Sequence, residues 1–314
     1  MTYAQTLEWM FARLPMYQRR GGADLNLKLQ GIQEFSAYLG NPHEQFRSLH
    51  VAGTNGKGSS SHMLASVLQE AGYTTGLYTS PHLKDFRERI RVDGHVVPQS
   101  FVVRFIEEYK EYLEAHSLSF FELTVGMAFD YFAKSKVDIA VIEVGLGGRL
   151  DSTNIITPEV SLITNIGMDH MEYLGNTLAE IAREKAGIIK TKVPVVISET
   201  QAEVRPVFEE VAAKHKAPLF FAGEIDPEEY PTDLKGSYQK QNVRGVVETL
   251  KHLGRIDDRQ CTVETSVGTV NCRLQEDGSI SIENVESFRE ASDVKLDVNG
   301  IGTVIGDVAW GGNW

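Results

Sequence analysis

Short apolar runs alternate with longer amphipathic stretches along most of the chain. The short runs are rich in valine and isoleucine and end at glycine, proline or polar residues, so they predict buried strands over residues 47–52, 74–79, 137–144, 160–166 and 193–198. The longer stretches repeat apolar residues three and four positions apart, which predicts helices over residues 59–72, 100–116, 177–189 and 203–216. This alternation predicts an α/β fold with a mainly parallel sheet flanked by helices.

The last 60 or so residues follow another pattern. The stretch CTVETSVGTVNCRLQEDGSISIENV alternates apolar and polar positions, and EDGS and a later VNG are turn signals. Such alternation predicts antiparallel strands. We therefore expect two units, an α/β unit over residues 1–254 and a short β-rich segment over residues 255–314.

Composition narrows the class of protein. The 314 residues include 31 Lys and Arg against 43 Asp and Glu, a net charge of −12, so the chain repels polyanions and we expect no nucleic-acid partner. An anionic substrate would need a locally positive pocket. No signal peptide or membrane span is expected, and the two cysteines, Cys261 and Cys272, form no disulfide framework. These features predict a cytoplasmic protein.

The first candidate for chemistry is the loop HVAGTNGKGSS at residues 50–60. It follows a predicted strand and precedes a predicted helix, so its amides should converge at the helix N-terminus, where the helix dipole favours an anion. The strict phosphate-loop pattern is not met, because Val51 replaces its first glycine and Gly58, not a hydroxyl residue, follows Lys57. Both a phosphate loop and a glycine-rich turn with a solvated lysine remain open.

Two further strand ends add polar residues. Glu143 closes one predicted strand, and Asp169 and His170 lie just beyond the next. Because ligands of an open α/β sheet bind outside the carboxyl ends of its strands, we expect these residues to face one crevice with Lys57. Glu143 could hold Mg²⁺, which prefers oxygen ligands. For His170, a histidine satisfied by hydrogen bonds at the strand end is an equal alternative.

Six motifs now form a recognisable series. HVAGTNGKGSS, YTSPHLKDFRERIRV, FFELTVGMAF, IEVGLGGRLDSTNI, TNIGMDHMEYLG and IAREKAGIIK occur in this order. Together they resemble the ATP-binding region of the folylpolyglutamate synthase and dihydrofolate synthase family, within the Mur ligase superfamily, over residues 3–254. The resemblance implies a P-loop NTPase-like fold, that of the Mur ligase central domain.

The resemblance also implies site residues. The family's phosphate loop corresponds here to Gly53, Thr54, Asn55, Gly56, Lys57, Gly58 and Ser59, and an ATP-contacting asparagine to Asn242. Its magnesium ligands correspond to Ser80, Glu143 and His170, and its carbamylated lysine to Lys185. We expect catalytic roles for Lys57, Lys185 and His170. The pteroate contacts correspond to Asp24, Lys28, Phe121, Glu122, Thr124, Leu150, Asp151 and Ser152.

The implied reaction is an ATP-dependent amide ligation that needs Mg²⁺. ATP phosphorylates a carboxylate of dihydropteroate or of a folate glutamate tail, and the amine of L-glutamate then attacks the acyl phosphate. After Leu253 we find neither the GRW- or GRF-like segment nor the DxAHNP-like segment of the family's second, ligase domain. A module that binds nucleotide and pteroate without ligating them is therefore the alternative function.

The final segment has a resemblance of its own. VETSVGTVNCRL, IENVESF and VNGIGTVIGDVAWGGNW, within residues 260–314, resemble an internal piece of the proline racemase and hydroxyproline epimerase family. Neither cysteine lies in that family's catalytic context, so racemase activity is the least favoured function, and both cysteines are expected in or beside strands. We expect a monomer if these strands are covered.

Overall fold

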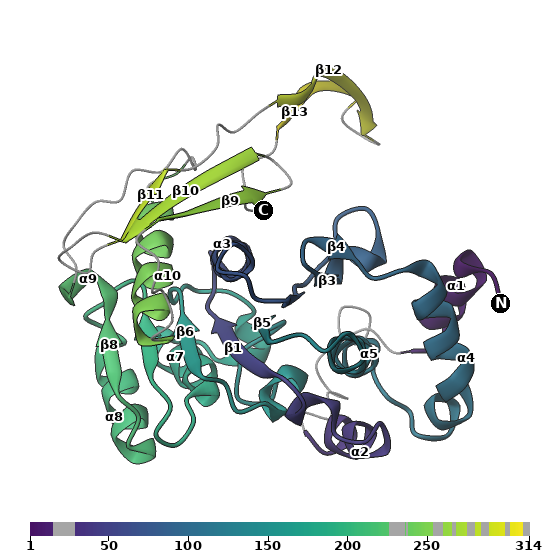
Figure 1. Ribbon diagram of the computed structural model, residues 1–314, viewed down its shortest axis with the longest axis horizontal. Coiled ribbons are helices and arrows are strands. Elements are labelled where there is room, and N and C mark those ends of the chain that lie inside the picture. The colour runs from purple at the N-terminus through teal and green to yellow at the C-terminus, as the bar shows by residue number, and fades with distance from the viewer. Residues whose placement is uncertain are drawn as a thin grey trace.

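A central eight-stranded sheet organises the protein (Figure 1). The computed structural model describes residues 1–14, 29–225, 236 and 238–253, together with the backbone of five strands between residues 260 and 309. The central strands are β1 (Arg47–Ala52), β2 (Thr75–Tyr78), β3 (Ile90–Val92), β4 (His95–Val96), β5 (Ile139–Glu143), β6 (Val160–Ile163), β7 (Val195–Ile197) and β8 (Leu219–Phe221). Their order is β4-β3-β2-β5-β1-β6-β7-β8; the pairs β2–β3 and β3–β4 are antiparallel, and the other pairs of this sheet are parallel. The predicted, mainly parallel α/β fold is confirmed.

Helices cover both faces of this sheet. They are α1 (Tyr3–Arg13), α2 (Gln30–Tyr38), α3 (Lys57–Glu70), α4 (Gln99–Ala115), α5 (Phe120–Ser135), α6 (Met171–Leu174), α7 (Leu178–Lys185), α8 (Arg205–His215), α9 (Ala222–Ile225) and α10 (Gln239–Leu253). The described residues also contain the 3₁₀ turns η3 (Pro42–Glu44), η4 (Phe86–Arg89), η5 (Ser152–Ile155) and η6 (Ala186–Ile188).

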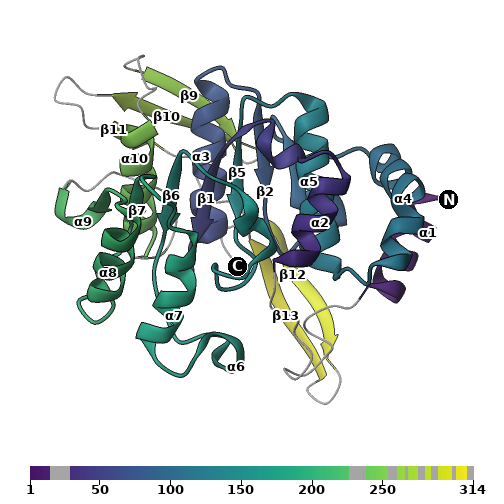
Figure 2. The same ribbon diagram turned by 90° about the horizontal axis from the view of Figure 1, so that it is seen from below.

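The two faces bury different clusters, because successive strand residues point to opposite sides. Leu49 and Val51 of β1 pack with Leu64 of α3 and Val246 of α10. Ala52 points the other way and belongs to a cluster with α7 and α8. A third cluster joins α1, α2, α4 and α5 to strands β2, β3 and β5, and Figure 2 shows these four helices gathered at one end of the sheet.

The ends of the predicted elements differ from the structure by a few residues. The predicted helix over 177–189 ends at Lys185 and continues as η6, where Gly187 packs against the backbone of Arg149. Three further strands, β3, β4 and β8, and the helices α1, α2, α5, α6, α9 and α10 were not predicted from the apolar pattern. Within the described residues, no helix has the length and apolar character needed to cross a membrane.

The C-terminal segment is built from antiparallel strands, as predicted. One sheet has the order β11-β10-β9, from Ile280–Glu283, Gly268–Leu274 and Gln260–Thr265, and β12 (Arg289–Val298) pairs with β13 (Gly302–Ala309). Cys261 and Cys272 lie in β9 and β10, in opposed register positions. In Figure 1 this β-rich segment lies on the side of the sheet that α3 and α10 cover. The boundary predicted at residues 254–255 falls outside the described residues.

Candidate functional site

The loop at residues 53–56 joins β1 to α3 at the carboxyl end of the sheet. Gly56 has φ of +84°, and a Cβ atom there would collide with the side-chain amide of Asn242. A Cβ atom on Gly53 would collide with the hydroxyl of Thr164. Both glycines are therefore required for the close approach of the loop to its neighbours.

Two lysines meet at this loop. Lys57 Nζ donates to the carbonyl oxygens of Gly53 (3.1 Å) and Thr54 (3.2 Å). Lys185, which is buried at the end of α7, donates its own Nζ to the Gly53 carbonyl at 2.9 Å. Burial, and then the charge of Lys57, lower the pKa of Lys185 to about 7. The structure thus brings together the two lysines that the motifs singled out separately.

The segment after β6 braces the loop from the other side. Asn165 accepts the Thr54 amide on its carbonyl oxygen and the Asn55 amide on its side-chain oxygen, both at 2.9 Å. Thr164 Oγ1 donates to the Asn55 carbonyl at 2.5 Å. No role was predicted for Thr164 or Asn165, although both belong to the quoted motif TNIGMDHMEYLG and lie at the end of the strand predicted over residues 160–166.

The start of α10 reaches the first turn of α3, which begins with Lys57, Gly58 and Ser59. The buried side chain of Gln239 donates to Ser59 Oγ at 3.4 Å and accepts from Asn242 Nδ2 at 2.8 Å. The predicted residues Ser59 and Asn242 therefore belong to one polar group, and Gln239, which the motifs did not identify, links them.

Glu143 ends β5 as a buried carboxylate beside this loop. Its Oε2 accepts the backbone N–H of Ser80 at 3.2 Å, so two predicted metal ligands are neighbours. Burial raises the pKa of Glu143 to about 7, and the nearby charge of Lys57 limits the rise. Both residues offer oxygen atoms, the ligand type that Mg²⁺ prefers.

His170, the third predicted metal ligand, lies on an exposed turn before α6. Its side chain is 54% exposed and its Nε2 lies 3.6 Å from Asp169 Oδ2. Its φ is +47°, and its backbone N–H donates to Asp169 Oδ1 at 2.8 Å. The described residues contain no group of three or more His, Cys, Asp and Glu side chains arranged to hold a metal ion.

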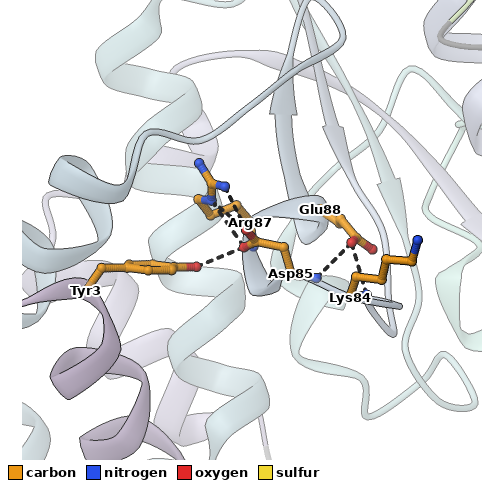
Figure 3. Close-up of polar contacts among 5 residues, drawn as sticks. All are labelled: Tyr3, Lys84, Asp85, Arg87 and Glu88. Carbon is orange, nitrogen blue, oxygen red and sulfur yellow. Dashed lines mark hydrogen bonds and ion pairs between the residues drawn. The ribbon is translucent and has the colours of Figure 1, made fainter.

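The loop after Ser80 is tied to α1 (Figure 3). Asp85 caps η4, accepts the hydroxyl of Tyr3 at 2.9 Å and pairs with Arg87 at 2.6 Å. The bond from Arg87 lowers the pKa of Asp85 to about 2. Glu88 accepts the backbone N–H groups of Lys84 (3.0 Å) and Asp85 (2.8 Å). These bonds give the segment that follows Ser80 a defined path.

Three of the predicted substrate contacts lie in the first turn of α5. The ring of Phe121 packs so closely on Gly145 that a Cβ atom there would collide with it. Thr124 Oγ1 lies 3.1 Å from the hydroxyl of Tyr78. Glu122 accepts the N–H and hydroxyl of Ser119 and so caps its own helix. Asp24 and Lys28 lie outside the described residues.

The remaining predicted contacts, Leu150, Asp151 and Ser152, form the entry to η5. Asp151 is buried, and its carboxylate accepts the N–H groups of Gly145 (3.0 Å) and Leu146 (2.9 Å). Burial raises the pKa of Asp151, and the hydrogen bonds that it accepts oppose this rise. Phe121 and Asp151 therefore contact the same turn, the one that follows Glu143.

Comparison with known proteins agrees with this geometry. Residues 51–267 match the family model described as the Mur ligase middle domain. The chain belongs to the Mur ligase family. Within that family it is 39% identical over 269 residues to the dihydrofolate synthase/folylpolyglutamate synthase of Bacillus subtilis (strain 168). The match covers 76% of this chain and 61% of that protein. This Mur ligase family member thus spans about three fifths of that relative's length.

Solved structures show the same fold. The folylpolyglutamate synthase of Thermotoga maritima is 32% identical with a TM-score of 0.71, and the match covers 97% of this chain and 70% of that one. A structure described as an FPGS-AMPPCP-folate complex has a TM-score of 0.74 at 32% identity, covering 80% and 67% of the two chains. These similarities confirm the resemblance to the folylpolyglutamate and dihydrofolate synthases within the Mur ligase family.

The second resemblance is also found. A family model described as proline racemase matches residues 235–314. This match is confined to the last quarter of the Mur ligase family member and overlaps the end of the first match.

Proposed function

We propose that residues 53–59 bind the phosphates of ATP in this Mur ligase family member. The observation that supports this most directly is the pair of lysines on the Gly53 carbonyl, next to the buried carboxylate of Glu143. The Lys57 ammonium group supplies a local positive charge in a chain whose net charge is −12. Among the described residues, Lys57 donates only to backbone carbonyls, so it can exchange them for phosphate oxygens. Asn242 would contact the nucleotide from the α10 side.

The residues present suit magnesium. Glu143 and the hydroxyl of Ser80 would hold the ion, with His170 approaching from the turn before α6. Burial raises the pKa of the Glu143 carboxyl group because it disfavours the charged form. A bound cation would stabilise the charged carboxylate. A bound magnesium ion would offset the negative charge that develops on the transferring phosphoryl group.

The reaction we propose is ATP-dependent addition of L-glutamate to dihydropteroate or to a folate glutamate tail. A carboxylate is a poor acyl donor, and phosphorylation by ATP supplies a leaving group before the glutamate amine attacks. Lys57 would stabilise the phosphoryl oxygens, while Lys185, as the carbamylated lysine of the resemblance, would help to orient the metal ligands. The relative described above as a complex with AMPPCP and folate supports both substrate classes.

The acceptor would lie against the first turn of α5 and the entry to η5. Phe121 offers an aromatic face and Thr124 a hydroxyl, and Leu150, Asp151 and Ser152 border the same turn. Glu122, Asp24 and Lys28 complete the proposed contacts. We further propose that residues 1–254 form the ATP-binding unit and residues 255–314 a separate β-rich unit.

A specific observation favours a second candidate function. Residues 235–314 match a proline racemase model, and a module that binds ATP and pteroate without ligating them is therefore the second candidate. The chain spans 61% of its Bacillus relative and 42% of the folylpolyglutamate synthase of Lacticaseibacillus casei.

One experiment separates the two candidates. The purified chain is incubated with ATP, magnesium, L-glutamate and either dihydropteroate or a reduced folate, and the products are measured by mass spectrometry. A ligase releases ADP in step with a product that is one glutamate longer. A binding module shows nucleotide affinity by calorimetry without product, and a chain that shows neither contradicts the proposal.

A further inference from the structure

A buried hydrogen-bonded chain connects β1 to the turn that follows Glu143. His50 Nε2 lies 2.9 Å from Thr153 Oγ1, and Thr153 Oγ1 lies 2.5 Å from Asp151 Oδ1. His50 and Thr153 are fully buried, and Asp151 is 6% exposed. The three side chains join segments that are about 100 residues apart in the sequence, so the contact is a product of the fold.

The direction of these bonds follows from the proton count. The Thr153 hydroxyl has one hydrogen, which it donates to the Asp151 carboxylate, so His50 must donate its Nε2–H to Thr153. Burial, and to a lesser extent the charge of Lys190, lower the pKa of His50 to about 3. The imidazole is therefore neutral near pH 7. His50 Nδ1 has no hydrogen-bond partner among the described residues. The ring is therefore committed to a single bond, the one toward Thr153.

Asp151 passes this restraint to the backbone. Val144 N–H donates to the Val51 carbonyl at 2.9 Å, which is the last bond of β5 to its neighbour β1. The next two N–H groups, of Gly145 and Leu146, donate to Asp151 Oδ2. Asp151, and not the sheet, thus sets the path of the chain as it leaves Glu143.

Within the described residues, the Asp151 carboxylate accepts four hydrogen bonds. Besides Gly145 and Leu146, its donors are the backbone N–H and the hydroxyl of Thr153. A carboxylate with four such donors is held in one orientation. Loss of the Thr153 hydroxyl would remove one donor and also disconnect His50.

We propose that Thr153 and His50 are positioning residues for the metal site, acting through Asp151 on the turn that fixes Glu143. This inference rests on the proposed role of Glu143 as a magnesium ligand. His50 lies on β1, three positions before the phosphate loop. In this proposal it connects β1 to the turn that follows Glu143 at the end of β5. A role in core packing alone would instead change the stability of the fold with no selective effect on metal.

The test compares Thr153→Val, which removes only the hydroxyl, with Thr153→Ser, which keeps it. Calorimetry of the full chain measures the Kd of AMPPCP in magnesium chloride and in EDTA. We expect Thr153→Val to reduce the magnesium-dependent gain in affinity roughly tenfold, as for loss of a buried bond to a charged group, with the Kd in EDTA unchanged. Thr153→Ser should retain the wild-type gain.

Ser161→Ala is the matched control. Ser161 lies opposite His50 in the β1–β6 register, is equally buried, and donates to the Ile188 carbonyl instead of to this chain. It should keep the wild-type magnesium effect. If Thr153→Val does not fold, as judged by circular dichroism, His50→Leu and His50→Gln replace the pair, because glutamine retains a donor near the Nε2 position.

The outcomes distinguish failure of the proposed metal site from failure of the positioning role of Thr153 and His50. A wild-type chain whose AMPPCP affinity is insensitive to magnesium overturns the proposed metal site itself. A magnesium effect in the wild type that survives in Thr153→Val overturns only the positioning role. Equal weakening of binding in magnesium and in EDTA, or an equal loss in Ser161→Ala, also overturns it, because the effect would then be general to the loop or the core.

Discussion

Acid should destabilise this protein partly through His50, and a His50→Gln variant would measure that contribution. The pKa of His50 falls from 6.5 to about 3 on folding because the ring is fully buried. Between these values the unfolded chain binds a proton that the folded chain does not, so the free energy of unfolding decreases as pH falls. Above pH 6.5 His50 is neutral in both states, so this loss of unfolding free energy is absent there. One pKa unit corresponds to about 1.4 kcal/mol, so the loss is about 2 kcal/mol at pH 5 and approaches about 5 kcal/mol near pH 3.

Urea unfolding at pH 7.5 and pH 5.0, followed by circular dichroism, is the assay. The quantity of interest is the change in unfolding free energy between the two pH values, because subtraction removes the packing change that the substitution causes. This change should be smaller by about 2 kcal/mol in His50→Gln than in the wild type. Ser161→Ala, which removes a buried polar group that does not titrate, should keep the wild-type dependence. Identical pH dependence in wild type and His50→Gln would show that His50 accepts a proton in the folded state, which contradicts the burial argument.

Three other predictions concern the site and its supports. Lys57→Ala should abolish measurable nucleotide binding by calorimetry while the circular dichroism spectrum stays unchanged, and wild-type affinity in this variant would exclude the phosphate-loop role. Lys185 should form a carbamate in ¹³C-bicarbonate, visible by NMR and missing in Lys185→Ala; because its pKa is about 7, the signal should grow as pH rises from 6 to 8, and a signal independent of pH would argue against a neutral amine nucleophile. Tyr3→Phe should lower the free energy of unfolding by about 1 kcal/mol through loss of the bond to Asp85. Tyr131→Phe is the comparison and should have less effect, because the Tyr131 ring packs on Phe101 and its hydroxyl makes no hydrogen bond within the described residues.

The sheet could be predicted where its strands are buried on both faces. β5 appears in the sequence as a continuous apolar run because helices cover both of its sides. β3, β4 and β8 have only two or three residues each, too few to show a period. Helix α5 was missed for the opposite reason, since ten of its sixteen residues are buried and it therefore lacks a polar face.

The site was predictable as far as chain position determines it. Glu143 could be placed at the carboxyl end of a strand, and Lys57 at a strand-to-helix loop, because those positions follow from local pattern. The roles of Thr153, Asn165 and Gln239 depend on partners far away in the sequence, and only the folded chain shows which way their side chains point. Serine, threonine and amide residues of this kind are common in loops, so their type alone identifies no function.

Because Lys57 and Lys185 donate to the same carbonyl of Gly53, the pKa of Lys185 depends on the charge and position of Lys57. Each ammonium group repels the other, so a ligand that draws Lys57 away or neutralises its charge makes Lys185 more basic. Binding of a ligand at the loop therefore changes the pKa of Lys185, which lies on a helix more than 120 positions further along the chain. A titration of Lys185 with and without nucleotide would report on binding at the loop without any label on the nucleotide.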